Sequence, residues 1–323
     1  MKTPVTVDSA PRTKAQGAAR APRIIRRGYL RRQVIPYLFV LPFLILFVAF
    51  FVAPLLYAFQ QSLFKEHRSG LGFGPPRIEW AGAANYLQAL HDVHFWDGFG
   101  RVLLFGVVQI TVMMTIALVL AMLMDSTVMR FQRFFRVAFF VPYAVPVVIA
   151  AIMWGFFYSP TSSPIVQAFA ALHLPAPVFL GPHATLWSIA NISTWEFVGY
   201  NMIIFYSAMQ SIPQEIYESG RLDGLSETGI ALRLKLPLIV PALILGLLFS
   251  IVGALQLFNE PIVLKNLTNS AITTSYTPNI FAYNVAVVNT DFNYGGAIAV
   301  ILGVVTFIFS YGFLRLTRGR LGV

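Results

Sequence analysis

The sequence predicts an all-α membrane protein with six transmembrane helices. Of the 323 residues, 57% are hydrophobic and only 11% are charged, whereas soluble domains carry about a quarter charged residues. A helix needs about 20 consecutive apolar residues to cross a hydrocarbon core about 30 Å thick. Six stretches meet this requirement, at residues 34–58, 102–124, 137–158, 185–209, 237–258 and 295–314.

The basic residues predict which side of the membrane each connection faces. If the N-terminus is cytoplasmic, eighteen of the 23 Lys and Arg residues lie in cytoplasmic segments and five lie in outer segments. Cytoplasmic loops are enriched in Lys and Arg. We therefore expect both termini, and the connection between the fourth and fifth spans, to face the cytoplasm.

The N-terminal part combines a basic arm with the first span. Residues 1–33 are rich in Ala, Pro and Arg without apolar periodicity, which predicts a disordered arm that contacts anionic headgroups. The following apolar run is longer than that of a cleavable signal peptide, so we expect it to stay uncleaved. Its Pro36, Pro42 and Pro54 indicate a bent helix, because neighbouring helices can satisfy the freed carbonyls.

The next segments alternate between outer loops and spans. The outer loop at 59–101 contains an amphipathic piece at 85–90. The third span carries Pro142 and Pro146. The second outer loop, 159–184, has no Lys, Arg, Asp or Glu, so we expect it to pack on the outer membrane surface.

The fifth span begins at Pro237, and proline is favoured at the first position of a helix. Gly246, Ser250 and Gly253 lie along one face of this span. Small residues at such a spacing allow helix backbones to approach closely, so we expect helix packing there. The outer loop that follows, 259–294, is polar.

The stretch 212–237 differs from its surroundings, because it carries seven charges between two apolar spans. Its pattern predicts a short helix, a break at Gly224 that permits a chain reversal, and a second helix. We expect Glu215, Glu218 and Asp223 at or near the N-terminal half of a helix, where acidic groups offset the helix dipole. A charged helix–turn–helix on one side of a membrane indicates a surface for a partner.

This stretch resembles the EAA loop of binding-protein-dependent ABC importer permeases. The family pattern is Glu-Ala-Ala, three residues, Gly, nine residues, and Ile-x-Leu-Pro. The matching residues keep that spacing in full, and they are Glu218, Ser219, Gly220, Gly224, Leu234, Leu236 and Pro237. Gly220 departs from the pattern, and glycine in place of alanine lowers helix stability by about 1 kcal/mol.

Other pieces resemble the carbohydrate-importer branch of that family, the maltose-type permeases, from about residue 34 to 316. They are Ile212-Pro213 and Leu222-Asp223-Gly224, Gly82-x-x-Asn85-Tyr86 with Phe95-Trp96, Phe135-Arg136 with Pro142-Tyr143, Trp195 with Gly199-Tyr200-x-Met202, and Phe292-x-Tyr294-Gly295. Each piece is weak alone, and together they favour this branch.

The resemblance implies a type I ABC importer permease fold at 34–316, with a coupling loop at 211–237 and a cytoplasmic tail at 317–323. It implies that the chain forms half of the pathway for a di- or oligosaccharide, or a related polyol or glycerol derivative. The loop would insert a coupling helix into a cytoplasmic ATPase subunit. The residues implied in docking are Glu215, Glu218, Ser219, Gly220, Arg221, Asp223, Gly224 and Pro237.

The resemblance also implies the partners and the location. They are a second permease subunit in a heterodimer, a cytoplasmic ATPase dimer, an extracytoplasmic solute-binding protein and the bilayer of a bacterial cell membrane. The chain has no G-x-x-x-x-G-K-[ST] phosphate loop, so we expect a non-enzymatic subunit without a cofactor, with ATP and Mg held by the ATPase. The absence of cysteine excludes thiolate metal sites, and the topological placement of basic residues argues against nucleic acid.

Polar residues inside spans usually face a partner or a cavity. The candidate pathway residues are Asn191, Trp195, Glu196, Tyr200 and Asn201 in the fourth span and Gln256, Asn259 and Glu260 near the outer end of the fifth. Aromatic faces, amides and carboxylates suit a sugar. The alternative is structural: Trp195 and Tyr200 as packed aromatics, Asn191 in an interhelical hydrogen bond, and Glu196 in an ion pair.

Two other classes of function remain open from the sequence: a self-sufficient secondary transporter, and a membrane scaffold or enzyme without transport activity. Secondary transporters usually contain inverted repeats. No clear repeat of that kind is visible, and no catalytic constellation is visible either.

Overall fold

The computed structural model describes residues 25–67, 77–126, 129–268 and 271–320. The chain divides after Leu56 into two units, which are described separately. The first unit contains helix α1 (Ile25–Phe47), a π-helical turn at Val48–Val52 and the start of α2 (Ala53–Ser62).

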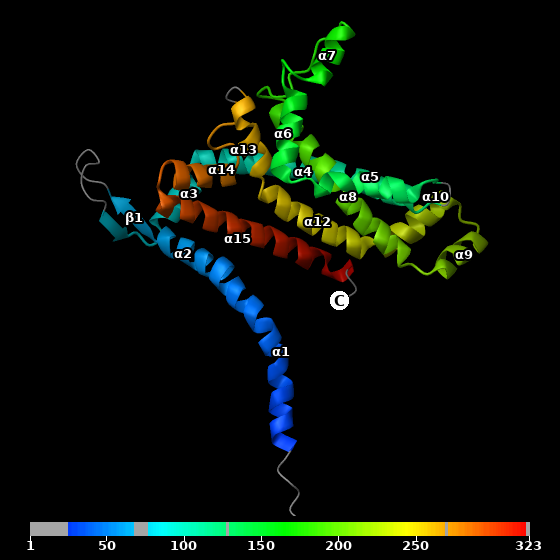
Figure 1. Cartoon of the computed structure of the whole chain (residues 1–323), viewed down its shortest axis with the longest axis horizontal. Helices are drawn as coiled ribbons and strands as arrows, with labels where there is room; N and C mark the ends of the chain where they lie inside the picture. The colour runs from blue at the N-terminus through cyan, green and yellow to red at the C-terminus, as the bar shows by residue number, and fades with distance from the viewer. Residues whose placement is uncertain (1–24, 68–76, 127–128, 269–270, 321–323) are drawn as a thin grey trace, which may run out of the picture. The chain divides into compact units, whose positions relative to one another are not determined.

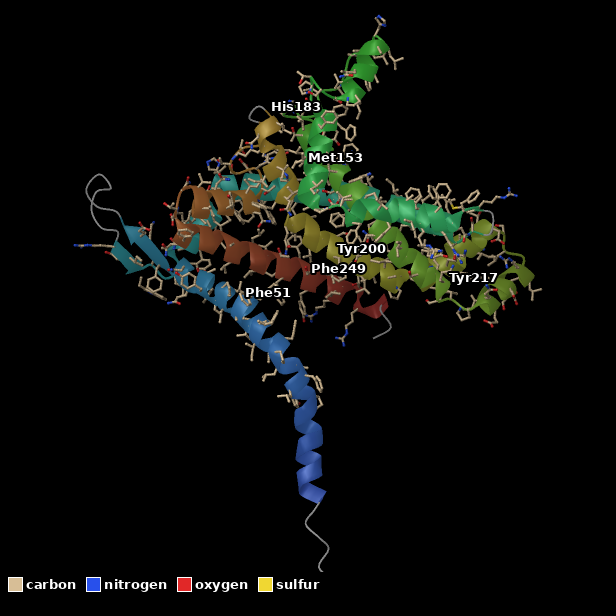
Figure 2. All side chains as sticks on the ribbon, in the orientation of Figure 1. Phe51, Met153, His183, Tyr200, Tyr217 and Phe249 are labelled. Carbon is tan, nitrogen blue, oxygen red and sulfur yellow. The ribbon has the colours of Figure 1, made fainter. Side chains whose placement is uncertain are left out.

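The first unit is an exposed apolar helix. Phe39 and Phe51 are 82% and 70% exposed, and the Phe51 side chain projects from the ribbon in Figure 2. The wide π-helical turn comes directly before Pro54, whose ring and missing N–H disturb regular helical hydrogen bonding. Helix α1 begins at Ile25, inside the segment 1–33 that we predicted to be disordered, because no proline interrupts the chain between Pro22 and Pro36. The rest of that predicted arm lies outside the described residues.

The second unit begins with the rest of α2, followed by a β-hairpin and further helices (Figure 1). Strands β1 (Phe64–His67) and β2 (Arg77–Trp80) are antiparallel, with Phe64 opposite Trp80. The helices are α3 (Ala84–His91), α4 (Val93–Met124), α5 (Gln132–Ala144), α6 (Val147–Tyr158), α7 (Pro164–Ala171), α8 (Thr185–Gln210), α9 (Gln214–Leu222), α10 (Glu227–Ile230), α11 (Leu236–Leu238), α12 (Val240–Leu255), α13 (Asn259–Leu264), α14 (Pro278–Tyr283) and α15 (Phe292–Thr317). Shorter π-helical turns lie at Ala231–Lys235 and Asn284–Val288, and 3₁₀ turns at Lys265–Leu267 and Arg318–Arg320.

Several helices are long and apolar enough to cross a membrane. Within the described ranges there are four, namely Pro36–Ser62, Val93–Met124, Val240–Leu267 and Phe292–Thr317, and five if the bent pair α5 and α6 counts as one span. Helix α8 has 26 residues and coincides with the fourth predicted span. Its Asn191, Glu196 and Asn201 make it more polar than the others.

The third predicted span, 137–158, is not one straight helix. It consists of α5 and α6, which are bent by 97°. Val145, with ψ 127°, and Pro146, with ψ 130°, have extended backbone between the two helices. The cause is proline chemistry, because Pro146 has no N–H to donate and disfavours the helical conformation of the residue before it. The segment predicted as the third of six transmembrane helices is therefore two helices with a break at Pro146.

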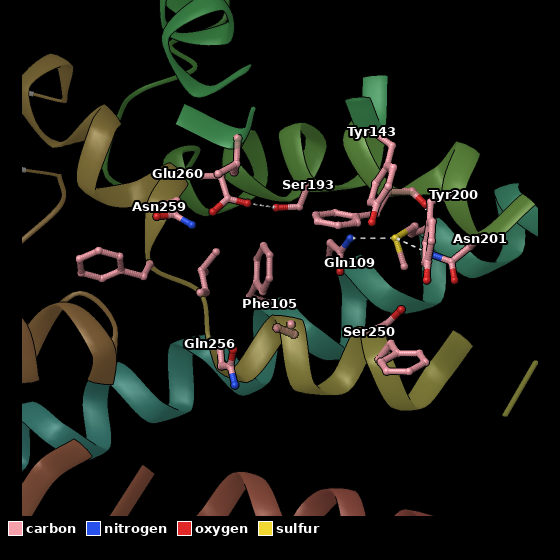
Figure 3. Close-up of a pocket in the computed structure, with 18 residues that line it drawn as sticks. Phe105, Gln109, Tyr143, Ser193, Tyr200, Asn201, Ser250, Gln256, Asn259 and Glu260 are labelled. Carbon is pink, nitrogen blue, oxygen red and sulfur yellow. Dashed lines mark hydrogen bonds between the residues drawn. The ribbon is translucent and has the colours of Figure 1, made fainter. Parts of the chain in front are cut away.

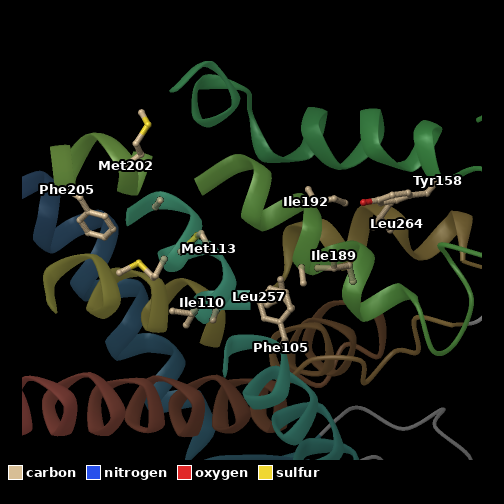
Figure 4. Close-up of a cluster of buried hydrophobic side chains, with 14 of the residues drawn as sticks. Phe105, Ile110, Met113, Tyr158, Ile189, Ile192, Met202, Phe205, Leu257 and Leu264 are labelled. Carbon is tan, nitrogen blue, oxygen red and sulfur yellow. The ribbon is translucent and has the colours of Figure 1, made fainter. Parts of the chain in front are cut away.

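The buried core lies between α4, α8 and α12 (Figure 4). Phe105 and Met113 on α4 pack with Met202 and Phe205 on α8, and each of these four side chains is at most 2% exposed. Helix α12 runs beside α15 (Figure 1). Apolar side chains at helical spacing on α4, α8 and α12 thus pack into one hydrophobic core.

Close backbone contacts set the spacing of these helices. A Cβ atom on Gly199 of α8 would collide with the carbonyl oxygen of Phe139 on α5. A Cβ atom on Gly246 would lie 3.0 Å from Asn201 Oδ1, which confirms the predicted close packing at this glycine. At Gly253, by contrast, no atom would lie within 4 Å of an added Cβ.

Specific polar contacts hold the connections that we predicted to be outer loops. Helix α3 confirms the amphipathic piece predicted at 85–90, and Asn85 Nδ2 donates to the carbonyl of Phe64 at 2.7 Å. The Arg101 guanidinium donates to the Tyr276 carbonyl at 2.7 Å and stacks over the Tyr276 ring at 4.6 Å. The polar loop predicted at 259–294 contains α13 and α14.

Candidate functional site

A cavity of about 400 Å³ lies among α4, α5, α6, α8, α12 and α13 (Figure 3). Among the described residues, its wall combines aromatic rings, side-chain amides and hydroxyls with one carboxylate. The lining residues are Phe105, Gln109, Met113, Tyr143, Val147, Ser193, Phe197, Tyr200, Asn201, Phe249, Ser250, Gly253, Ala254, Gln256, Leu257, Phe258, Asn259 and Glu260.

Two interruptions of helical structure border this cavity. Tyr143 and Val147, on either side of the bend between α5 and α6, both line it. Helix α12 ends at Leu255, and Gln256 to Phe258 separate it from α13. Inside a membrane, non-helical backbone is tolerated where it is buried in protein or lines a cavity. The position of these breaks at the cavity therefore fits a membrane-embedded protein.

Glu260 is the charged residue in the cavity wall. Its side chain is 6% exposed, and its Oε1 accepts a hydrogen bond of 2.8 Å from the Ser193 hydroxyl (Figure 3). Glu196, one helical turn after Ser193, is 4% exposed and has one carboxylate oxygen without a hydrogen-bond partner. Glu196 is not among the cavity-lining residues.

Aromatic and amide groups make up the opposite part of the wall. The Tyr143 and Tyr200 rings are stacked with centroids 4.6 Å apart. Asn201 donates to the Phe197 carbonyl at 3.1 Å, and its buried Oδ1 has no hydrogen-bond partner. These groups can offer apolar ring faces and hydrogen bonds to a polyhydroxylated ligand.

The structure brings five of the eight predicted pathway residues together at the cavity. They are Tyr200, Asn201, Gln256, Asn259 and Glu260. Asn191 and Trp195 instead contact α6. Asn191 Nδ2 donates to the Tyr158 hydroxyl at 2.8 Å, and Trp195 packs edge-on against Trp154 with centroids 5.8 Å apart.

Several lining residues were not predicted, notably Gln109, Tyr143, Ser193 and Ser250. Gln109 carried a usable signal, because it is a lone amide in the apolar second span. Ser193 and Ser250 carried none, because serines also serve as small packing residues in membrane helices. Ser250 belongs to the small-residue face of α12, which thus forms cavity wall beyond the tight contact at Gly246.

At residues 211–237, here called the polar segment, α9 ends in a Schellman motif. Gly224 has φ +80°, a conformation that glycine adopts readily. The Leu225 N–H donates to the Gly220 carbonyl at 3.0 Å, and the Gly224 N–H donates to the Arg221 carbonyl at 3.1 Å. The Ser226 hydroxyl then caps α10 by accepting from the Gly229 N–H. The predicted helix, Gly224 break and second helix are confirmed.

A buried ion pair joins the polar segment to α4. Lys235 Nζ contacts the carboxylate of Asp125, and the two side chains are 13% and 6% exposed. Gln210, the last residue of α8, donates to the same carboxylate at 2.5 Å. The ring of Tyr217 on α9 lies under Lys235 Nζ at 5.1 Å, and burial, together with the Asp125 carboxylate, raises the pKa of the Tyr217 phenol.

The chain matches the model of a known protein family. Residues 117–318 match the family described as binding-protein-dependent transport system inner membrane component. The chain belongs to this family. The match covers both the cavity-lining part of α8 to α13 and the whole polar segment, and the predicted resemblance is therefore confirmed.

Individual relatives of this permease are known by name. The arabinooligosaccharides transport system permease protein AraP of Bacillus subtilis (strain 168) is 25% identical over 292 residues, which cover 90% of each chain. The lactose transport system permease protein LacF of Rhizobium radiobacter is 26% identical over 278 residues, covering 85% of this chain and 91% of LacF.

A solved structure has the same fold as this permease. It is a chain of a bacterial alginate ABC transporter in complex with an alginate pentasaccharide-bound periplasmic protein. The TM-score is 0.78 at 18% identity, and the match covers 93% of the permease and 99% of that chain. The ABC importer permease fold predicted from the sequence is thereby confirmed.

The permease exposes most of the predicted docking residues of the polar segment. The exposed ones are Glu215, Glu218, Ser219, Arg221, Asp223, Gly224 and Pro237. Gly220 is buried, and a Cβ there would lie 2.6 Å from Leu234 Cδ1. Leu222 is 89% exposed, which leaves an apolar side chain on the surface of α9.

Two local predictions about the polar segment were wrong. Asp223 is the C-cap of α9 and does not lie in the N-terminal half of a helix. Pro237 does not open the fifth span but lies in α11, after the π-helical turn Ala231–Lys235, and α12 begins at Val240. The wide turn accommodates the missing N–H of Pro237 without ending the helical path.

Proposed function

We propose that this permease is one of two transmembrane subunits of an ATP-driven importer for a sugar. The observation that carries the proposal is the cavity, whose stacked tyrosines, side-chain amides and buried Glu260 offer ring faces and hydrogen bonds. Sugars combine apolar ring faces with many hydroxyl groups. The names of LacF and AraP, a lactose and an arabinooligosaccharide system, support this class of substrate.

The permease lies in a bacterial cell membrane with six spans and cytoplasmic termini. Helix α8 provides the polar span, and α5 with α6 provides the bent one. The partner permease is a different chain, so that the pathway lies in a heterodimer. An extracytoplasmic binding protein delivers the sugar, as the complex of the alginate transporter with a periplasmic protein suggests for this fold.

Helix α9 is the coupling helix, and it docks on a cytoplasmic ATPase subunit that binds ATP and Mg. Its exposed face offers Leu222 as an apolar contact, surrounded by charged residues such as Glu218 and Asp223. Closure of the ATPase dimer displaces α9. The buried Lys235–Asp125 pair passes this displacement to α4, and α4 reaches the cavity at Gln109.

Co-purification tests this function. The tagged permease, expressed in its native host, is expected to bring down a second permease of similar size and an ATPase dimer. Vesicles containing the whole complex and its binding protein should take up sugar only with ATP. Sugar uptake by the permease alone would contradict the proposal and favour a secondary transporter, and isolation without an ATPase would favour a scaffold.

A further inference from the structure

The cavity wall carries an unbalanced acidic group, and this observation limits the substrate. Of the lining residues within the described ranges, Glu260 is the one with a charged side chain, and none is Lys, Arg or His. We infer that the wall contributed by this chain selects neutral sugars and rejects anionic ones such as aldonates, uronates and sugar phosphates. The inference rests on the proposed function and specifies its substrate class.

Two arginines on helices that border the cavity make their contacts elsewhere. Arg101 on α4 is held by the carbonyl and ring of Tyr276. Arg136 on α5 donates to the Tyr206 hydroxyl at 3.0 Å and stacks over that ring at 4.5 Å. Neither arginine lines the cavity. An anionic ligand would therefore lose its hydration without gaining a cationic partner from this wall.

Glu260 itself adds to the selection of neutral sugars over anionic ones. Glu260 is almost fully buried, and the nearby Glu196 is buried as well, with an unpartnered oxygen. If Glu260 is ionised, it repels a carboxylate or phosphate across a short distance in a poorly screened interior. If Glu260 is protonated, the wall is neutral, and an anion still finds no counter-charge. Rejection of anions follows in both protonation states.

Neutral hydroxyl groups meet suitable partners in the same wall. Tyr143, Tyr200 and Ser250 line the cavity, and their hydroxyl groups can donate to or accept from the hydroxyls of a sugar. Gln109, Gln256 and Asn259 add amides that both donate and accept. A neutral polyhydroxylated ligand can therefore replace its water contacts, whereas an anion finds hydrogen-bond donors but no counter-charge in this wall.

The test compares sugars that differ in one charged group. The whole importer, with its partner permease and ATPase but without the binding protein, is placed in lipid nanodiscs. Dissociation constants are measured by calorimetry at neutral pH for lactose against lactobionate and for maltose against maltobionate. The expected result is binding of at least one neutral sugar about tenfold or more tighter than its acid.

Variants locate the selection at Glu260. Glu260→Arg should remove or reverse the preference, because it places a cation in the wall. Glu79→Arg makes the same change of net charge on the exposed strand β2, and it should leave the preference unchanged. Assembly of both variants is checked by co-purification of the ATPase.

The outcomes separate this inference from the proposed function. Equal or tighter binding of the acids by the wild-type importer overturns the inference, as does binding of neither neutral sugar by an importer that assembles and hydrolyses ATP. An unchanged preference in an assembled Glu260→Arg importer also overturns it. Failure of the permease to assemble with any ATPase overturns the proposed function instead. If Glu260→Arg does not assemble, the wild-type ratio alone decides.

Discussion

At the scale of single residues, the Lys235–Asp125 pair has the largest expected energetic effect. The Lys235 and Asp125 side chains are only 13% and 6% exposed, and Gln210 satisfies a second oxygen of the carboxylate. Removing one partner of a buried pair leaves the other charge uncompensated, whereas removing both leaves no charge behind. The polar segment is thus tied to the transmembrane helices by a contact in which each single change is expected to be destabilising.

We predict that Asp125→Asn or Lys235→Met lowers the free energy of unfolding by about 3 kcal/mol, and that the double variant recovers part of this loss. Thermal unfolding of the detergent-solubilised permease measures the order of the variants. The control is Arg221→Ala, which removes an exposed ion pair with Glu227 and should change the stability by less than about 1 kcal/mol. Equal effects of the buried and exposed variants would contradict the prediction.

Gly199 and Gly253 allow a comparison between a tightly packed glycine and one beside open space. Gly199→Ala forces a methyl group into the Phe139 carbonyl, and we expect a loss of about 1–3 kcal/mol in the free energy of unfolding. Gly253→Ala adds its methyl group to open space and should be neutral within about 0.5 kcal/mol. Melting temperatures of the two purified variants check the difference. A Gly199→Ala permease as stable as the wild type would show that α5 can move away from α8.

At the scale of elements, local sequence determines the backbone path of the polar segment. The Schellman motif fixes the angle between α9 and α10, because its hydrogen bonds and the positive φ of Gly224 leave one backbone path. Gly220 packs against Leu234 and Leu225, and an added methyl group would force the Leu234 side chain to move. The glycine that departs from the family pattern therefore permits close packing.

We predict that Gly224→Asp keeps the transmembrane fold but loses ATPase binding, because a side chain strains the left-handed conformation and redirects α9. Glu218→Lys should have the same effect on ATPase binding through its charge. The control is Gly229→Ala, where an added methyl group makes only ordinary contacts in α10. Pull-down of the ATPase from membranes is the measurement, and retention by Gly224→Asp would speak against α9 as the docking element.

Some of these elements could be predicted from the sequence, and others could not. The helix–Gly224–helix pattern and the extent of α8 followed from local chemistry and from apolar length. The bend at Pro146 had a visible cause, but prolines also occur in continuous membrane helices, so the pattern alone did not decide. The cavity face of α8 was harder to predict. Lipid is as apolar as a protein core, so hydropathy does not tell that Ser193 faces inward while Trp195 contacts α6.

At the scale of the whole molecule, α4 connects the cavity to the polar segment. Gln109 lines the cavity and Asp125 caps the end of the same helix, about 24 Å away at 1.5 Å per residue. Helix α8 repeats this arrangement, with Ser193 at the cavity and Gln210 at the Asp125 carboxylate. Two packed helices therefore join the cavity to the polar segment.

We predict that Lys235→Met lowers the amount of sugar transported per ATP by about tenfold while ATPase binding persists, because α9 still docks but α4 no longer follows it. Uptake and ATP hydrolysis are measured together in proteoliposomes that contain the whole importer. Leu232→Met, an exposed change in the same π-helical turn, is the control. An unchanged ratio in Lys235→Met would show that another contact connects the two regions.

The Schellman motif at Gly224 also bears on how α9 can move relative to α10. Between the end of α9 and the start of α10 lie four residues, Asp223 to Ser226, and Gly224 N–H, Leu225 N–H and Ser226 Oγ all take part in the caps. In the proposed coupling role of α9, this capped connection would transmit a displacement of α9 to α10 with little bending. A flexible linker of equal length would absorb the displacement, and we would expect ATP hydrolysis without transport.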